Sequence, residues 1–278
     1  MRQRTMEYVE TPPRSVLSRW IRRYWMLRRE GRPPNAPTAV ECVFPDGCME
    51  IVLNLADPFV ELSSGSPLEQ PTAMLVGPTT RPMRIGPSGR VDVIGIRFEP
   101  HGASVALDIP PAELVDVAMS LEDVARLPFR VWMERLAGTR EWPARVEILE
   151  SALLGAIRER RTAPFVRSAT SIIAATEGRL PVDRLAMEIG VSRRRLERVF
   201  RAQVGLSPKT LSRIVRFHRF LGELRAGDPG LASAAVRCGY SDQSHLTRDF
   251  RSFTDTTPAA FLEDGDLLPR IFAGLPEP

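Results

Sequence analysis

Cysteine and histidine are scarce in this chain of 278 residues, with three of each. An odd, small number of cysteines offers no disulfide framework and fits a reducing compartment. His101 is the only histidine before residue 200, which argues against a metal-dependent enzyme with several histidine ligands. The sequence also lacks a Gly-x-Ser-x-Gly elbow, a phosphate-binding loop and a dinucleotide fingerprint. We therefore expect neither an enzyme nor a cofactor or bound metal.

Long apolar runs are missing as well. No stretch approaches the roughly 18 apolar residues that a membrane helix needs, and the Arg-rich N-terminus has no signal-peptide core. We expect a cytoplasmic protein without membrane contact. Lysine occurs once, at Lys209, so nearly every base is arginine.

The positive charge is confined to one part of the chain. Residues 1–164 hold 21 Arg and 21 acidic residues, residues 165–262 carry a net charge of +7, and the remainder from Glu263 is net −3. A basic surplus in one small region is typical of proteins that bind the phosphate backbone of nucleic acid.

The same region contains a duplicated pattern. Leu196, Arg198, Phe200, Arg201 and Pro208 recur 50 residues later, and Ala186, Gly190 and Ser192 recur 49 residues later. Each copy reads as a helix, a turn with glycine and a second helix capped by serine, which is a helix-turn-helix. The first three helices are predicted at Phe165–Thr176, at Val182–Ile189 and from Ser192 onward. A longer helix follows at Pro208–Arg225, the next one begins at Asp228-Pro229, and the last one ends near Phe253.

The N-terminal part has a different texture. Leu17, Trp20, Ile21, Tyr24 and Trp25 recur at near-helical spacing, which predicts an aromatic face over a core. Short apolar runs separated by Pro and Gly then predict strands at Val40–Phe44, Cys48–Leu55, Thr72–Val76 and Val91–Phe98. Alternation in Met49–Leu55 indicates a half-buried strand.

Helical periodicity returns at Asp108–Val117 and at Trp142–Arg160. The second of these carries an apolar stripe through Val146, Leu149, Leu153, Leu154 and Ile157, which must pack on the β-rich part or on a second chain.

We predict an α+β protein of two domains, with an N-terminal cupin-like β-barrel or sandwich, a helical linker and an all-α C-terminal domain. The expected bounds are 1–112 for the β-rich regulatory domain, 113–163 for the helical linker or dimerisation region, 164–263 for the double helix-turn-helix and 264–278 for a tail.

The duplicated region resembles the C-terminal domain of AraC/XylS-type transcriptional regulators. The resemblance rests on the 50-residue duplication, Leu-x-Arg-x-Phe-Arg in both copies, the segment Gly239–His245 and Thr257-Pro258. It implies seven helices, two DNA-reading motifs, frequent dimerisation through the N-terminal domain and recruitment of RNA polymerase. Asp255 replaces the glycine expected there, and because Asp tolerates left-handed backbone we expect the turn to survive.

The N-terminal part is similar to an uncharacterised cupin-like domain found before such readers, through Trp20, Trp25, Pro45-Asp46-Gly47, Val76–Pro78 and Gly95–Pro100. This resemblance implies a role in sensing an unknown small-molecule effector or in forming a homodimer.

Outward positions of the two recognition helices are the candidate contacts to double-stranded DNA. Arg pairs with guanine, Gln with adenine and Glu with cytosine, whereas Arg193, Arg201 and Arg251 at the flanks suit phosphate. Arg198 could instead form an ion pair with a carboxylate one turn away in its own helix, and this would weaken its role in reading DNA. The full set is Arg193, Arg194, Glu197, Arg198, Arg201, Gln243, Ser244, His245, Thr247, Arg248 and Arg251, with Asp242 also outward.

Other residues leave alternatives open. Cys42, Cys48 and His101 are candidates for a metal or thiol site, although buried inert cysteines fit better. Arg97 and Glu99 could hold a polar ligand in the barrel or form a structural pair outside it. The main prediction is a sequence-specific, effector-responsive transcriptional regulator. The alternatives are a DNA-localised enzyme with a barrel cysteine and a ligand-free regulator whose barrel only dimerises.

Overall fold

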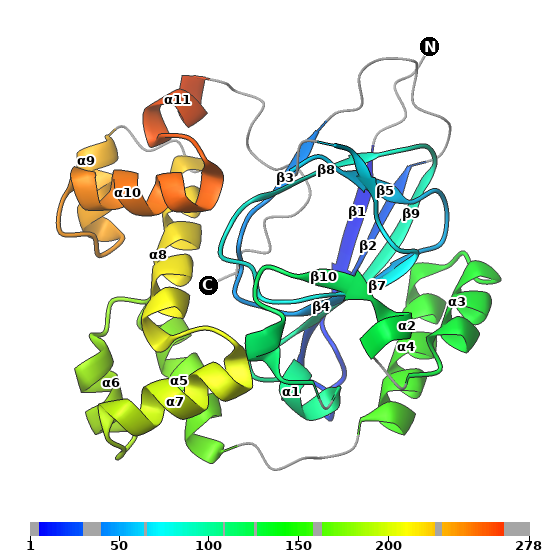
Figure 1. Ribbon diagram of the computed structural model, residues 1–278, viewed down its shortest axis with the longest axis horizontal. Coiled ribbons are helices and arrows are strands. Elements are labelled where there is room, and N and C mark those ends of the chain that lie inside the picture. Colours follow the sequence, from blue (N-terminus) through cyan, green and yellow to red (C-terminus); the bar gives the residue numbers. More distant parts are fainter. Residues whose placement is uncertain are drawn as a thin grey trace.

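The computed structural model describes residues 6–29, 40–63, 66–107, 109–124, 127–157, 163–225 and 230–263. Two β-sheets with flanking helices form the N-terminal part, which we call the β domain, and a helical C-terminal part, residues 163–263, lies beside it (Figure 1). This confirms the two-domain α+β prediction. None of the helices in these ranges is long and apolar enough to cross a membrane.

Both sheets are antiparallel, and they face each other across a shared core. The large sheet has the order β1 (Glu7–Thr11), β2 (Ile21–Arg29), β9 (Val91–Phe98), β4 (Glu50–Asn54), β7 (Ala73–Val76) and β10 (Ala118–Ser120). The small sheet has the order β3 (Glu41–Val43), β8 (Met83–Pro87), β5 (Phe59–Glu61) and β6 (Leu68–Glu69).

The N-terminal aromatic segment is a strand, so its helical spacing was misleading. Residues 14–20 form turns and Ile21–Arg29 is β2, which pairs with β1 on one side and β9 on the other. The aromatic residues are nevertheless buried, as predicted, with Tyr24 and Trp25 on opposite faces of the large sheet. A central strand that is covered on both faces has no polar side, and its apolar positions can then imitate another period.

Strand β4 is also a central strand covered on both faces, so it is more buried than the alternation of apolar and polar residues in Met49–Leu55 predicted. Ile51 and Leu53 face the flanking helices, whereas Glu50, Val52 and Asn54 line a cavity between the two sheets. The polar residues of the alternation therefore point into the β domain instead of into solvent.

Helices cover the outer face of the large sheet. They are α1 (Ala103–Ala106), α2 (Leu121–Val124), α3 (Phe129–Ala137) and α4 (Trp142–Ala156). The 3₁₀ helix η1 (Pro111–Glu113) contacts the C-terminal part instead. The apolar stripe of α4 packs on this sheet, and the buried Arg145 forms a bidentate pair with Asp92 of β9 at 2.6 and 2.8 Å. Packing within the chain is thus confirmed for Val146, Leu149 and Leu153, whereas Leu154 of the predicted stripe is exposed.

The segment 113–163 is less helical than predicted. Asp108–Val117 contains only η1, since two consecutive prolines restrict the backbone, and Asp108 lies outside the described residues. Ala118–Ser120 adds β10 to the edge of the large sheet beside β7.

The C-terminal domain, which we call the reader, consists of seven helices in the described part of residues 163–263. These are α5 (Pro164–Ala175), α6 (Val182–Glu188), α7 (Arg193–Val204), α8 (Pro208–Arg225), α9 (Leu231–Arg237), α10 (Gln243–Thr254) and α11 (Pro258–Glu263). Figure 1 shows α8 running between α5–α7 at one end and α9–α11 at the other. The predicted cap at Asp228-Pro229 and the tail from residue 264 lie outside the described residues.

Candidate DNA interface

Each half of the reader contains one helix-turn-helix with the predicted glycine in its turn. Gly190 and Gly239 have φ values of +69° and +80°, which explains the glycine in both turns. The hydroxyl of Ser192 caps α7 by accepting the backbone N–H of Arg195 at 3.3 Å. In the second copy the predicted serine cap is wrong, because Asp242 and not Ser241 caps α10 by accepting the N–H of His245 at 2.7 Å. The extra residue of the second copy has thus become its N-cap.

The two recognition helices also end alike. Gly205 and Asp255 adopt positive φ, at +86° and +62°, and Pro208 and Pro258 begin the following helices. The expectation that Asp255 preserves the turn is confirmed.

On α7 the predicted faces separate as expected. Leu196, Phe200 and Val204 are fully buried, and Val199 is partly buried against the same core. The side chains predicted to contact DNA are exposed, except Glu197, which is half-buried.

The arginines of α7 differ in their partners. Arg193 pairs with Asp183 of α6 at 3.0 Å and with Glu197 at 2.9 Å, and these hydrogen bonds raise its pKa. No carboxylate in the described ranges lies within 4.0 Å of Arg194, Arg198 or Arg201. The residues one turn from Arg198 on α7 are Arg194, Arg195, Arg201 and Ala202, so α7 offers no intrahelical carboxylate to Arg198. Glu197, its neighbour in sequence, pairs with Arg193.

On α10, Gln243, Ser244, Arg248 and Arg251 are exposed, whereas Thr247 and His245 are half-buried. Thr247 donates its hydroxyl to the carbonyl of Gln243 at 2.8 Å. The His245 ring packs edge-on against Tyr240, with centroids 5.2 Å apart, and its Nδ1 lies 3.2 Å from the hydroxyl of Ser241. In the free protein His245 thus supports the turn before α10.

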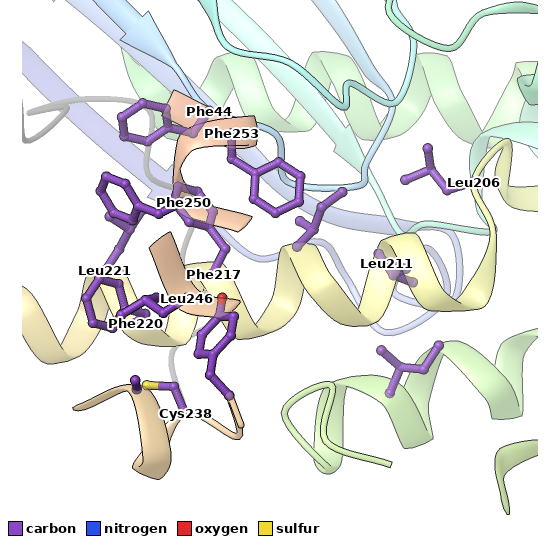
Figure 2. Packing of buried hydrophobic residues seen from close by; sticks show 14 of the residues in the cluster. Phe44, Leu206, Leu211, Phe217, Phe220, Leu221, Cys238, Leu246, Phe250 and Phe253 are labelled. Atoms are coloured by element: carbon purple, nitrogen blue, oxygen red, sulfur yellow. The ribbon is translucent and has the colours of Figure 1, made fainter. Parts of the chain in front are cut away.

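One continuous core joins the two units through α8. Phe217 of α8 contacts Phe250 and Phe253 of α10, with ring centroids 5.6 and 5.2 Å apart, and Figure 2 shows this aromatic group. Arg213 of α8 donates to the buried Asp249 of α10 at 2.9 Å. With 18 residues, α8 is about 27 Å long. It therefore carries the two recognition helices as one unit.

The β domain contains a second candidate site, the cavity of about 70 Å³ between its sheets. Arg97 of β9 is buried there, 3.1 Å from Asp46 and in contact with Glu50 of β4. Burial raises the pKa of Glu50 in spite of the adjacent Arg97. The other lining residues are mostly apolar, including Trp25, Phe59 and Met74.

Arg97 and Glu99, which sequence reasoning considered together, lie in different places. Arg97 faces the intersheet cavity, whereas Glu99 lines a separate cavity of about 370 Å³ between the β domain and the reader, together with Arg22 and Arg167. Sequence reasoning missed Asp46 and Glu50 as partners of Arg97. Only the turn at Pro45-Asp46-Gly47 was visible in the sequence, and it carried no sign that Asp46 points inward.

The candidate metal or thiol residues do not form one site. His101 lies with its Nε2 3.1 Å from the carbonyl oxygen of Arg19 and its Nδ1 3.3 Å from the hydroxyl of Thr170, while Cys48 contacts Arg22. Burial raises the pKa of Cys42 to about 11 and that of Cys48 to about 12. Both cysteines are therefore poor nucleophiles, because the thiolate is the reactive form.

Comparisons with known proteins agree with this geometry. Residues 185–264 match a family described as a helix-turn-helix domain, and residues 9–120 match a domain of unknown function, DUF6597. The chain is 33% identical over 91 residues to the probable transcription factor PqrA of Proteus vulgaris, covering 32% of this chain and 72% of that protein. It is 29% identical over 86 residues to the HTH-type transcriptional activator RhaS of Klebsiella pneumoniae (strain 342), covering 31% of each.

Among solved structures, an AraC-type transcriptional regulator from Chromobacterium violaceum is 28% identical, with a TM-score of 0.34 over 38% of this chain and 95% of that one. The duplicated helix-turn-helix, its turns and the match to PqrA over 72% of that protein show that the chain belongs to the AraC/XylS-type transcriptional regulators, with an N-terminal domain of unknown function.

Proposed function

We propose that this protein reads a specific DNA sequence through α7 and α10, placed in two successive major-groove faces, and that a small ligand in the intersheet cavity modulates this activity. The observation that carries the proposal is a pair of exposed recognition faces held on one rigid core by α8. Successive faces of the major groove are about 34 Å apart along the DNA, so one chain can reach both.

The roles of the side chains follow from their chemistry. Arg194, Arg198 and Arg248 suit guanine, Gln243 suits adenine and Glu197 suits cytosine. The flanking Arg201 and Arg251 suit phosphates, and Ser244, Thr247 and His245 lie on the same face. Arg193 would reach a phosphate only by exchanging its carboxylate partners.

The test is genome-wide recovery of DNA bound by the purified chain, with wild type and Arg198→Ala/Arg248→Ala in parallel. We expect a shared motif with two elements about one helical turn apart, lost in the double variant. Arg130→Ala/Arg135→Ala, which removes the same charge from α3, should keep the motif. A folded Arg198→Ala/Arg248→Ala protein that recovers the same motif would contradict the assignment.

The cavity supports the sensing part of the proposal, since it combines apolar walls with a buried charged group. Thermal unfolding in the presence of a metabolite library tests it, with Arg97→Met as the variant expected to lose the response. If no compound shifts the wild-type transition, a regulator whose β domain only forms contacts is favoured.

Homodimerisation, contact with RNA polymerase and a cytoplasmic location belong to the same proposal. Val146, Leu149 and Leu153 of α4 are buried within the chain and are not available for pairing, so a dimer must use other side chains. Sedimentation of the full chain with and without the recovered DNA site decides the oligomeric state.

A further inference from the structure

The turn between β3 and β4, residues Phe44–Cys48, connects the β domain to the reader. Phe44 packs against Phe217 of α8 and Phe261 of α11, with ring centroids 5.6 and 6.1 Å apart. Figure 2 shows Phe44 beside the aromatic residues of the reader. Phe44 therefore belongs to the core of the reader, although the chain places it in the β domain. The turn is therefore embedded in the domain that reads DNA.

The next residues of the turn contact α8 at two places, His218 near its middle and Leu211 in its first turn. The carbonyl oxygen of Pro45 accepts a hydrogen bond from Nε2 of the buried His218 at 2.6 Å. Gly47, with φ +74°, lies so close to α8 that a Cβ atom there would be 2.5 Å from Leu211 Cδ1. A displacement of this turn must therefore break contacts with α8.

The same turn is a wall of the intersheet cavity. Phe44, Asp46 and Cys48 all line the cavity. Asp46 accepts the backbone N–H of Cys48 at 2.8 Å through Oδ1, and its Oδ2 lies 3.1 Å from Arg97 Nε. Of the two carboxylates on Arg97, Glu50 is fixed in a central strand and Asp46 is held only by the turn.

Asp46 also borders the interdomain cavity of about 370 Å³, so the turn has space on its other side. Arg22 lines that cavity as well. Burial opposes the charge of Arg22, but Cys48, Glu99 and Asp46 outweigh it and raise its pKa. Asp46 therefore has a second cationic neighbour towards which it can move without losing all charge compensation.

We propose that the Phe44–Cys48 turn transmits the binding of a ligand in the intersheet cavity to the reader. When the ligand binds or leaves, Asp46 exchanges its ion pair with Arg97 for one with Arg22, and the hydrogen bond from His218 to Pro45 breaks or forms. This inference rests on the proposed function, since it assumes that the cavity takes an effector and that the reader binds a specific site. Because α8 carries both recognition helices on one core, a change at its centre reaches both of them.

A double-mutant cycle on the full chain tests the inference, with affinity for the recovered DNA site as readout. Asp46→Asn keeps the acceptor for Cys48 but removes the charge, and His218→Leu keeps volume but removes the donor to Pro45. We expect each to change affinity by at least about fivefold in the same direction, the lower range of allosteric couplings. The double variant should change it no more than the larger single effect, because both act through one turn.

Two controls sharpen the cycle. Asp57→Asn alters a similar turn carboxylate of the β domain, one that accepts the N–H of Arg90, and should leave affinity unchanged. His218→Gln retains a donor near the position of Nε2 and should behave closer to wild type than His218→Leu.

Amide hydrogen exchange of residues 208–225 provides a readout without DNA. Asp46→Asn should accelerate exchange in the middle of α8 by about tenfold relative to Asp57→Asn. The inference would be overturned if Asp46→Asn left both the affinity for the DNA site and the amide exchange of α8 unchanged. It would also be overturned if the effects of Asp46→Asn and His218→Leu on affinity multiplied in the double variant. If the wild type binds no specific site, the proposed function fails instead, and the exchange experiment still decides whether the turn restrains α8.

Discussion

The charge state of His218 makes the contact between the two domains sensitive to acid. Burial lowers its pKa to about 4, against an ordinary value of 6.5; Asp46 opposes this effect, whereas Arg22 and Arg97 favour it. The neutral ring can donate Nε2–H to Pro45 while burying no charge.

A histidine with a depressed pKa binds its proton more readily in the unfolded chain than in the folded one. Its contribution to stability is therefore complete above about pH 6.5 and is lost as the pH falls towards 4. We expect about 2 kcal/mol of stability to disappear between pH 7.5 and 5 from this group. Chemical denaturation at the two pH values measures the loss, and His218→Gln should show a smaller one. An equal loss in both proteins would assign the acid sensitivity to other groups.

The buried cysteines lead to a second prediction. With a pKa of about 11, Cys42 should alkylate about 100-fold more slowly in the folded protein than in urea at pH 8, because the thiolate fraction falls tenfold per pKa unit. Cys48 should be slower still. Mass spectrometry after timed iodoacetamide treatment gives both rates. Rapid modification of Cys42 or Cys48 in the folded protein would instead favour the alternative of a DNA-localised enzyme with a reactive cysteine in the β domain.

At the scale of elements, the reader was far more predictable than the β domain. Residues such as Gly190 and Ser192 act locally, by allowing a positive φ or by capping a helix, so their effect is visible in sequence. The strand Ile21–Arg29 and the edge strand Ala118–Ser120 depend instead on partners distant in sequence, β9 and β7. The inward direction of Asp46 depends on Arg97, 51 residues away, which no local pattern reports.

The ends of α7 and α10, at Gly205 and Asp255, are equivalent positions of the duplication that have different surroundings. A Cβ atom on Gly205 would lie 2.8 Å from the carbonyl oxygen of Pro111 and 2.9 Å from a side-chain atom of Pro78. Gly205→Asp should therefore destabilise the protein and disturb the contact between α7 and η1. Asp255→Gly should stabilise it by about 1 kcal/mol, the cost of left-handed backbone for a residue with Cβ. Urea denaturation of both variants measures the asymmetry, and equal effects of opposite sign would show that η1 does not constrain the turn.

For the whole molecule, the uneven charge makes DNA binding a function of salt. The surplus of +7 lies in residues 165–262, while residues 1–164 are neutral, so the β domain adds little long-range attraction or repulsion. Release of counterions should make the logarithm of the binding constant fall linearly with the logarithm of salt concentration, with a slope of about −0.9 per phosphate neutralised.

This dependence separates the two classes of arginine proposed for the interface. Arg201→Ala should reduce the magnitude of the salt slope by about 1 and weaken binding to all sequences alike, because a phosphate contact carries no base preference. Arg198→Ala should relax the preference at one base pair of the recovered site, by about 1–3 kcal/mol. Titrations of the specific site and a scrambled site over a range of salt measure both quantities, with Arg135→Ala on α3 as the charge control. If Arg201→Ala narrows the difference between the two sites, Arg201 reads a base, and the flank of α7 enters the groove more deeply than its place at the helix end indicates.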